Sequence, residues 1–313
     1  MKKIVVGAIS LTILLAGCGG NKETNEEKVK MAQVMNDGNK TISYLVNSED
    51  GEHNLTKNSK IDKYIISEDG KIKVYNDTGK TKLGKISKME DKDLEKYIKE
   101  EDKKYFEEDK KYTLEKMKEF KENKRSEVLG NKKAYENNES EIKGEKDDEK
   151  IQDSKEYKKQ IEQEMNRKEK SYHYAEKIIE DIKGAKYDTP KERDLKTEVI
   201  ANESGTKSEE ERMNIVAHKF TDVDDKGNFY LSDKKAKNIK EYNSYFTDSM
   251  TTEKIFDKKY AGISNYSVSG ENENVSYLIT EVGDKADGGV LDNPSDSNVK
   301  EIDEESHISE MQE

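Results

Sequence analysis

The stretch from residue 90 to residue 170 most constrains how this chain folds. Of its 81 residues 49 are charged, 26 acidic and 23 basic. So few apolar side chains cannot build a core of their own, whereas mixed charge supports a solvated helix with many ion pairs between residues four apart. We therefore expect a charged helical segment that begins at Asp91 and is partly disordered near residues 123–150.

Two stripes of mainly apolar residues mark the helical faces that would be buried. The first contains Leu94, Ile98, Tyr105 and Tyr112. The second steps by 4, 3, 4, 3, 4 and 3 residues, the spacing of one helix face, and ends before Gly184, where a helix terminus is expected. Its members are Ile161, Met165, Lys168, Tyr172, Ala175, Ile179 and Ile182. We expect this stripe to pack on its own domain, and an intermolecular coiled coil is the alternative.

Strand patterns precede the charged segment. Apolar residues alternate from Ile42 to Val46, and a second apolar stretch, residues 61–66, is followed by the pair Asp69-Gly70. This pair is typical of a hairpin turn because both central residues of the turn need a positive φ. Strands are expected on both sides of it, with a fourth over residues 81–87. The sequence predicts a small antiparallel meander.

Short strand-like runs return after Tyr187, over residues 197–201, 214–220, 228–231, 260–268 and 274–282. Only 31% of the chain is hydrophobic and 40% is charged, against a usual charged share of about 25%. One large core is therefore implausible, and two small β domains joined by a polar segment fit better. The predicted fold class is α+β: a small antiparallel β domain, a charged helical segment and a second small β-rich domain.

The first eighteen residues have the pattern of an export signal. Met1-Lys2-Lys3 is a positive start, Ile4–Ala16 is a thirteen-residue apolar run, and Leu15-Ala16-Gly17-Cys18 ends at the only cysteine in the chain. Thirteen apolar residues are fewer than the roughly 20 that span a bilayer as a helix. A transmembrane helix and an ordinary secretory signal with a chance cysteine are the alternatives.

These residues resemble the signal of bacterial diacylglyceryl lipoproteins. The expected arrangement of a small sheet, a charged helical stretch and a second β-rich unit resembles uncharacterised surface lipoproteins of Gram-positive bacteria. The resemblance implies that the Cys18 thiol becomes a thioether to diacylglycerol and that a peptidase cleaves between Gly17 and Cys18. The acyl chains on Cys18 would then hold the protein on the extracellular face of the cell membrane, since two long chains contribute on the order of 20 kcal/mol.

The mature protein would have 296 residues and a formal charge of −14. This acidity argues against nucleic acid as a partner and against electrostatic binding to anionic lipid. The expected organisation is a signal peptide (1–17), a flexible tether (18–38), the small antiparallel β domain (39–89), the helical segment (90–184), the β-rich C-terminal domain (185–302) and a disordered acidic tail (303–313).

Known site motifs are incomplete in this chain. Residues 79–85 fit the first seven positions of a phosphate-binding loop, but Ile86 stands where a hydroxyl should bind magnesium. Residues 222–233 resemble a calcium loop, but Lys226 stands where an oxygen ligand belongs. The four histidines lack the spacing of a zinc site. We therefore predict no catalytic residue, no metal and no cofactor.

The leading hypothesis is a non-enzymatic surface protein that contacts an unknown protein partner, for instance in phage immunity or conjugation. A solute-binding lipoprotein of a transporter is the first alternative. An enzyme acting on the cell wall is another. A last alternative concerns the segment that cleavage removes, because residues 10–17 resemble the octapeptide pheromones released from enterococcal lipoprotein signals.

Overall fold

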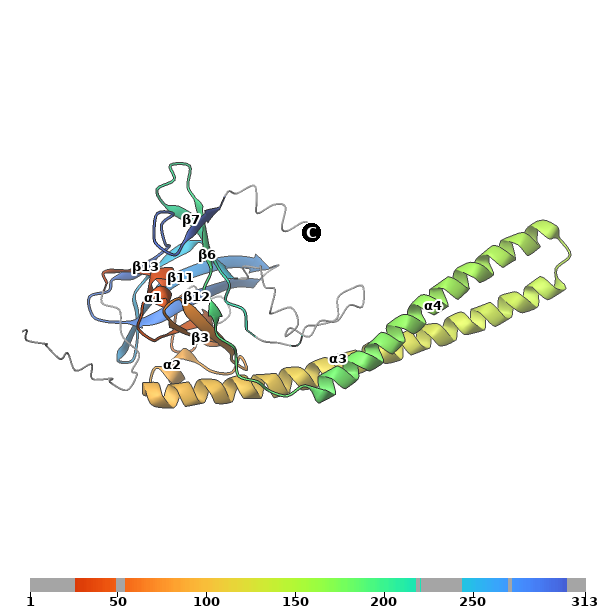
Figure 1. Cartoon of the computed structure of the whole chain (residues 1–313), viewed down its shortest axis with the longest axis horizontal. Coiled ribbons are helices and arrows are strands. Elements are labelled where there is room, and N and C mark those ends of the chain that lie inside the picture. Colours follow the sequence, from red (N-terminus) through yellow and green to blue (C-terminus); the bar gives the residue numbers. More distant parts are fainter. Residues whose placement is uncertain (1–25, 49–53, 218–219, 221–243, 270–271, 303–313) are drawn as a thin grey trace, which may run out of the picture.

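A computed structural model describes residues 26–48, 54–217, 220, 244–269 and 272–302, and it contains a β-sheet region and a long helical hairpin (Figure 1). The α+β class predicted from the sequence is confirmed. The helices are α1 (Met31–Asn36), α2 (Leu83–Ile86), α3 (Asp91–Gly144) and α4 (Asp148–Gly184). The strands are β1 (Lys28–Lys30), β2 (Thr41–Asn47), β3 (Lys60–Glu68), β4 (Lys71–Asn76), β5 (Arg193–Asp194), β6 (Thr197–Ala201), β7 (Ser208–Met213), β8 (Ser244–Phe246), β9 (Asp248–Thr251), β10 (Glu253–Ile255), β11 (Lys258–Ser269), β12 (Asn272–Val282), β13 (Gly288–Val290) and β14 (Lys300–Ile302).

The larger sheet contains strands that come before the helical segment in the sequence and strands that come after it. Its strand order is β1-β13-β9-β11-β12-β2-β3-β4-β5, and β10 pairs with β11. The long strand β12 lies antiparallel to β2, with Leu278 opposite Leu45. The two segments assigned to separate β domains from the sequence therefore share one sheet, and the boundary between them is corrected. The reason lies in β2, which is buried from Thr41 to Val46 and so needs a neighbour on each edge.

The expected meander is present over β2, β3 and β4. Asp69 and Gly70 join β3 to β4 with φ values of 50° and 69°, as the Asp-Gly pair predicts. The fourth strand predicted over residues 81–87 is wrong, since residues 83–86 form the short helix α2. Leu83 and Ile86 lie three residues apart and are both buried, which a helical turn allows and a strand does not.

The larger sheet is buried on both faces. One face packs on α1 and on residues of the smaller sheet, with Ile65, Ile263 and Phe246 in the same core. The flexible tether expected over residues 18–38 is therefore corrected for residues 28–36, because β1 and α1 bury Val29 and Met31 in this core. The opposite face packs on α2 and the first turns of α3, where Tyr44 and Tyr64 meet Leu94. Successive side chains of a strand point to opposite faces of the sheet, so Tyr64 and Ile65 of β3 lie in opposite cores.

The smaller sheet has the order β14-β6-β7-β8. Strand β6 agrees with the strand expected at residues 197–201. The strand expected at residues 214–220 is wrong for residues 214–217, because β7 ends at Met213, and residues 218–219 lie outside the described residues. Strand β7 reads Ser-Glu-Glu-Glu-Arg-Met, and its charges hid it from an apolar pattern. The run predicted at residues 228–231 lies outside the described residues.

Helices α3 and α4 form an antiparallel hairpin that projects from the sheets (Figure 1). Residues 123–144 are helical, and only residues 145–147 separate the two helices, so the partial disorder expected near residues 123–150 is corrected. The turn is well closed because the Asp147 side chain caps α4 by accepting the N–H of Glu149 at 3.1 Å. Some ion pairs cross between the two helices, as Lys121–Glu176 does, and others join residues three apart on one helix, as Lys116–Glu119 does.

The buried face of α3 differs from its predicted stripe beyond the first turns. Leu94 and Ile98 are buried against the sheet, as expected. Tyr112, however, is 50% exposed, and Phe106 and Met117 are buried instead. The buried face changes because the packing partner changes. The first turns of α3 pack on the sheet, whereas from Phe106 onward α3 packs on α4. The second stripe packs on α3 of the same chain, and Ile161, Ala175, Ile179 and Ile182 are buried.

Candidate functional site

The base of the hairpin is held by apolar packing. Phe106 of α3 packs edge-on against Tyr187 and at a tilt against Phe220, with ring centroids 5.7 and 5.3 Å apart. Ile178 and Ile182 from the end of α4 close the same core. This cluster fixes the end of the hairpin that adjoins the sheets.

Asp102 joins α3, the sheet and the chain that returns from α4. Its side chain is 4% exposed. One carboxylate oxygen accepts the N–H of Asn76 at 2.8 Å, and the other accepts the hydroxyl of Tyr187 at 2.9 Å. Burial and the Asp102 carboxylate raise the pKa of Tyr187, so its hydroxyl stays a donor. Three segments distant in sequence therefore meet at one carboxylate.

Beyond the base, ion pairs connect the two helices. Lys121 pairs with Glu176 at 3.0 Å, and further out Glu127 pairs with Lys168 at 2.5 Å. The hydrogen bond from Lys168 lowers the pKa of Glu127, which keeps this carboxylate ionised. Near the far end Lys158 pairs with Glu139 at 3.4 Å. The distal hairpin thus depends on charge more than its base does.

The seam between the distal helices also contains polar residues. Residues 117, 124, 131 and 138 of α3 step by seven and read Met, Lys, Asn and Asn. Asn138 is 5% exposed, and its Oδ1 has no hydrogen-bond partner among the described residues. A polar residue at such a position fixes register at a cost in stability. Ile161 supplies a buried apolar contact in this half.

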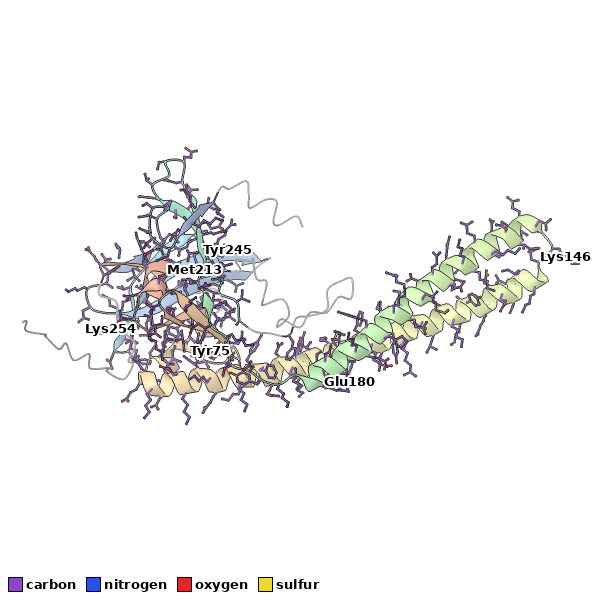
Figure 2. All side chains as sticks on the ribbon, in the orientation of Figure 1. Tyr75, Lys146, Glu180, Met213, Tyr245 and Lys254 are labelled. Carbon is purple, nitrogen blue, oxygen red and sulfur yellow. The ribbon has the colours of Figure 1, made fainter. Side chains whose placement is uncertain are left out.

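The hairpin reaches far from the sheets. At 1.5 Å per residue the 54 residues of α3 extend about 81 Å and the 37 residues of α4 about 56 Å. Figure 2 shows Lys146 at the far end and Glu180 near the base. Leu129 and Tyr157 are 52% and 54% exposed on the two distal helices. Exposed apolar side chains on a charged surface are suitable contact points for another protein.

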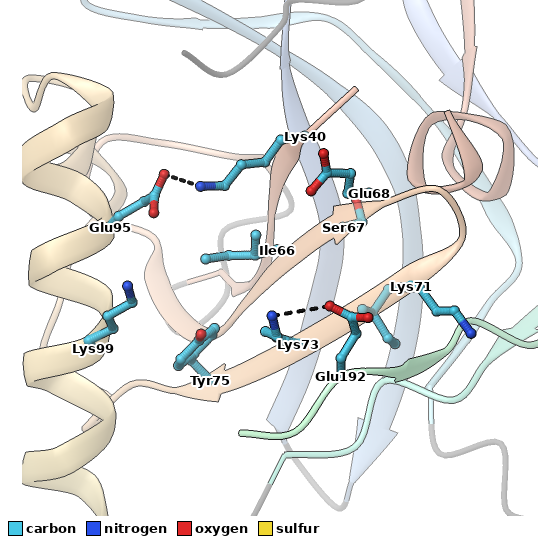
Figure 3. A pocket seen from close by; sticks show the side chains of 11 residues that line it. Lys40, Ile66, Ser67, Glu68, Lys71, Lys73, Tyr75, Glu95, Lys99 and Glu192 are labelled. Atoms are coloured by element: carbon cyan, nitrogen blue, oxygen red, sulfur yellow. Dashed lines mark hydrogen bonds and ion pairs between the residues drawn. The ribbon is translucent and has the colours of Figure 1, made fainter. Parts of the chain in front are cut away.

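A polar cavity lies between the sheet and the second and third turns of α3 (Figure 3). Its volume is about 210 Å³, and Ile66 and Tyr75 of the sheet form its floor. An ion pair connects Lys40 to Glu95 across its rim. On the opposite side Lys73 pairs with Glu192 at 3.1 Å, and Lys99 and Glu68 complete the wall; the full lining is Lys40, Ile66, Ser67, Glu68, Lys71, Ile72, Lys73, Tyr75, Glu95, Lys99 and Glu192.

A second hollow of about 420 Å³ lies between α3 and α4 above the hairpin base. It is lined by Lys118, Lys121, Glu122, Glu176, Ile179, Glu180 and Lys183. The Lys121–Glu176 pair crosses it, so charged groups of both signs face the space. Both hollows would accept a small polar group, and neither brings together a nucleophile and a base.

The structure places few of the residues singled out in the sequence. Gly17 and Cys18, the expected cleavage and lipidation residues, lie outside the described residues, as does the calcium-like loop at 222–233. The phosphate-loop pattern at residues 79–85 forms a turn at Gly79, with φ of 71°, followed by the four-residue helix α2. It opens no helix long enough to hold a phosphate. His173 is on the hairpin surface, 3.2 Å from Glu176.

Sequence reasoning missed the residues that line the first cavity. Lys40, Glu95 and Glu192 come from three separate segments, and no local spacing connects them. Asp102 was missed for a different reason, because a buried carboxylate looks like any other acid in a chain with 69 of them. The one available signal was its position. Asp102 lies four residues after Ile98 and eight after Leu94, on a helix face where an apolar residue is expected.

Comparisons with protein-family models, with curated proteins and with solved structures give no match. Within the described residues no three His, Cys, Asp or Glu side chains are grouped so as to hold a metal ion. None of the helices that the structure describes has a stretch both long and apolar enough to cross a membrane.

Proposed function

We propose that this protein is a membrane-anchored surface lipoprotein that acts through protein contact, with the α3–α4 hairpin as its contact arm. The anchor rests on the sequence of residues 1–18, where Cys18 would carry the acyl chains. The observation that carries the rest is the form of the hairpin. Its contacts with the larger sheet lie in the first turns of α3, where Leu94 and Ile98 are buried and Asp102 accepts the N–H of Asn76. Beyond them it extends a charged surface with exposed Leu129 and Tyr157.

The division of the hairpin supports this role. An arm that only held the sheets together would bury apolar side chains along its length. Here the outer half is held by Glu127–Lys168 and Glu139–Lys158, and its outward surface stays polar. The arm is therefore soluble without a partner and keeps a fixed shape, which reduces the entropy lost on binding.

The anchor is tested with Cys18→Ala in whole cells. The thioether cannot form, so the variant should accumulate uncleaved or appear in the medium, and the wild-type protein should partition with the membrane. A variant that stays membrane-bound at the size of the mature protein would contradict the anchor.

The contact arm is tested by photo-crosslinking in cells that make the full chain. A photoreactive residue at Leu129 or Tyr157 should crosslink to one and the same protein. The control is a photoreactive residue at Lys254, which is exposed on β10 in the sheets. If the crosslinks form equally from Lys254, or from neither hairpin position, the hairpin is not the contact arm.

A shortened hairpin gives a second test. Removal of residues 129–142 and 154–167 takes two heptads from each helix, so the seam keeps its phase and the Glu127–Lys168 pair is retained. The arm becomes about 21 Å shorter on each side. We expect the sheets to remain folded and the contact with the partner to be lost.

The alternative of a solute-binding lipoprotein is favoured by the cavity beside Tyr75 and Lys99, which would take a small charged solute. A ligand at 100 times its Kd should raise the free energy of unfolding by about 2.7 kcal/mol. The absence of a thermal shift with amino acids, short peptides, sugars and anions would remove this function.

A further inference from the structure

Two acidic side chains are completely buried where the smaller sheet meets α1. Glu211 lies on β7 and Asp292 follows β13, and each is 0% exposed. The Asp292 carboxylate accepts one hydrogen bond from the backbone N–H of Ala32 at 2.9 Å and another from the side-chain Nε2–H of Gln33 at 2.8 Å. Glu211 Oε2 accepts the N–H of Asp292 at 2.7 Å. The pair thus ties the smaller sheet to α1 and to the segment between β13 and β14.

The geometry favours one proton on the two acids. Glu211 Oε2 accepts the N–H of Asp292, so the two buried carboxyl groups lie close together, and two negative charges in a site closed to solvent would repel each other. Both oxygens of Asp292 already accept hydrogen bonds. Glu211 Oε1 has no hydrogen-bond partner among the described residues. It is the one oxygen of the two carboxyl groups that accepts no hydrogen bond from them, so the proton belongs on Glu211.

The charged groups around the pair do not neutralise it. Among the described residues no lysine, arginine or histidine pairs directly with Glu211 or Asp292. Asp296 adds a further negative charge near both, although Lys30 at the end of β1 pairs with it at 2.5 Å. On the neighbouring strands Arg212 of β7 pairs through Nε with Glu210 at 2.5 Å, and Lys300 of β14 pairs with Glu198 of β6 at 2.8 Å. The other charged groups of these strands, Glu209 and Glu301, are acidic.

We propose that Glu211 is a pH-dependent latch, which holds α1 and the segment after β13 on the smaller sheet while it is protonated and releases them as it ionises. Ionisation would place a second negative charge beside Asp292 with no water to solvate it. The place where α1 and the segment after β13 meet the smaller sheet is called the corner below, and its opening exposes both carboxyl groups to water.

The direction of the pH effect follows from burial. Burial, and then the negative charge of Asp292, raise the pKa of Glu211 well above its usual value. Above about pH 4.3 the open form ionises and the closed form does not, so closure weakens by up to tenfold per pH unit. The effect is complete once the pKa of the closed form is passed. The latch is therefore tightest in acid.

This inference does not rest on the proposed contact function. Strand β1 and α1 are the first described elements of the chain, and β1 pairs only with β13. Release of the corner at Asp292 would loosen the attachment of this N-terminal segment to the rest of the fold. The same corner would respond whether the chain is anchored or free.

The test uses NMR of the mature full-length chain. The side-chain carboxyl carbon of Glu211 should report the neutral form at pH 6, with the signal of exposed Glu209 on the same strand recorded as the reference. The amides of Ala32 and Asp292, corrected for intrinsic rates, should exchange faster as the pH rises from 5 to 8. Glu211 that titrates in the ordinary range, together with exchange protection that does not change, would overturn the proposal.

Glu211→Gln is the matched variant. Its amide oxygen can still accept the N–H of Asp292 and its amide nitrogen can donate to the carboxylate, so it imitates the protonated acid. Protection of Ala32 should then be independent of pH, whereas the control Glu209→Gln should retain the wild-type dependence. Equal pH dependence in wild type and Glu211→Gln would contradict the latch, and the direct titration of wild type decides the question even if the variant folds poorly.

Discussion

Replacement of Asp102 by alanine is expected to disconnect the hairpin from the sheet. The change removes the acceptor for the N–H of Asn76 and for the hydroxyl of Tyr187, at a position that is 4% exposed. A hydrogen bond to a charged group contributes about 1.5 to 3 kcal/mol, and a buried donor without a partner carries its full desolvation cost. Loss of both bonds should lower the free energy of unfolding by about 3 to 6 kcal/mol.

Asp102→Asn should lose about half as much, because the amide oxygen can replace one acceptor and the Tyr187 hydroxyl can turn to accept from the amide nitrogen. Urea unfolding followed by circular dichroism measures both variants. The control is Glu107→Ala, an exposed carboxylate on the same helix, with an expected change within about 0.5 kcal/mol. If Asp102→Ala were as stable as Glu107→Ala, the carboxylate would not join the hairpin to the sheet.

Three further predictions concern the hairpin in acid and two of the glycines. Hydrogen bonds, first from Arg167, hold the pKa of Glu164 at about 2 on the exposed surface of α4. Its stabilising effect is present above the unfolded pKa near 4.3 and is lost as the pH falls toward 2, so hydrogen exchange should accelerate in α4 over this range and not in β2–β4. Gly262→Ala should prevent folding to soluble protein, since its Cβ would lie 1.9 Å from the Leu278 carbonyl oxygen, whereas Gly130→Ala, with nothing within 4 Å on an exposed helix, should stabilise by up to about 1 kcal/mol in a thermal melt.

Local patterns in the sequence were reliable where one element decides its own conformation. The Asp69-Gly70 turn was predictable because its positive φ values select those residues. The stripe that ends at Ile182 was predictable because its spacing repeats over many turns. In both cases no distant part of the chain was needed.

Long-range pairing was not predictable for a physical reason. Strands β2 and β12 are more than two hundred residues apart, and each has an apolar pattern that would suit several neighbours. Strand β7 was missed because Glu211 is buried as an acid, against the usual preference of that residue type. The sequence likewise cannot tell Asp102 from the many solvated acids of α3, because only the folded contacts distinguish them.

The fixed projection of the hairpin is tested most directly by a distance between its base and its far end. With Cys18 replaced, the chain has no other cysteine, so spin labels can be attached at cysteines introduced for Glu108 and Lys143, both exposed in α3. The rise of a continuous helix predicts a single narrow distance distribution centred at about 53 Å, before the length of the labels is added. A broad distribution, or a distance far below this value, would show that the arm is not the extended antiparallel hairpin on which the proposed function depends.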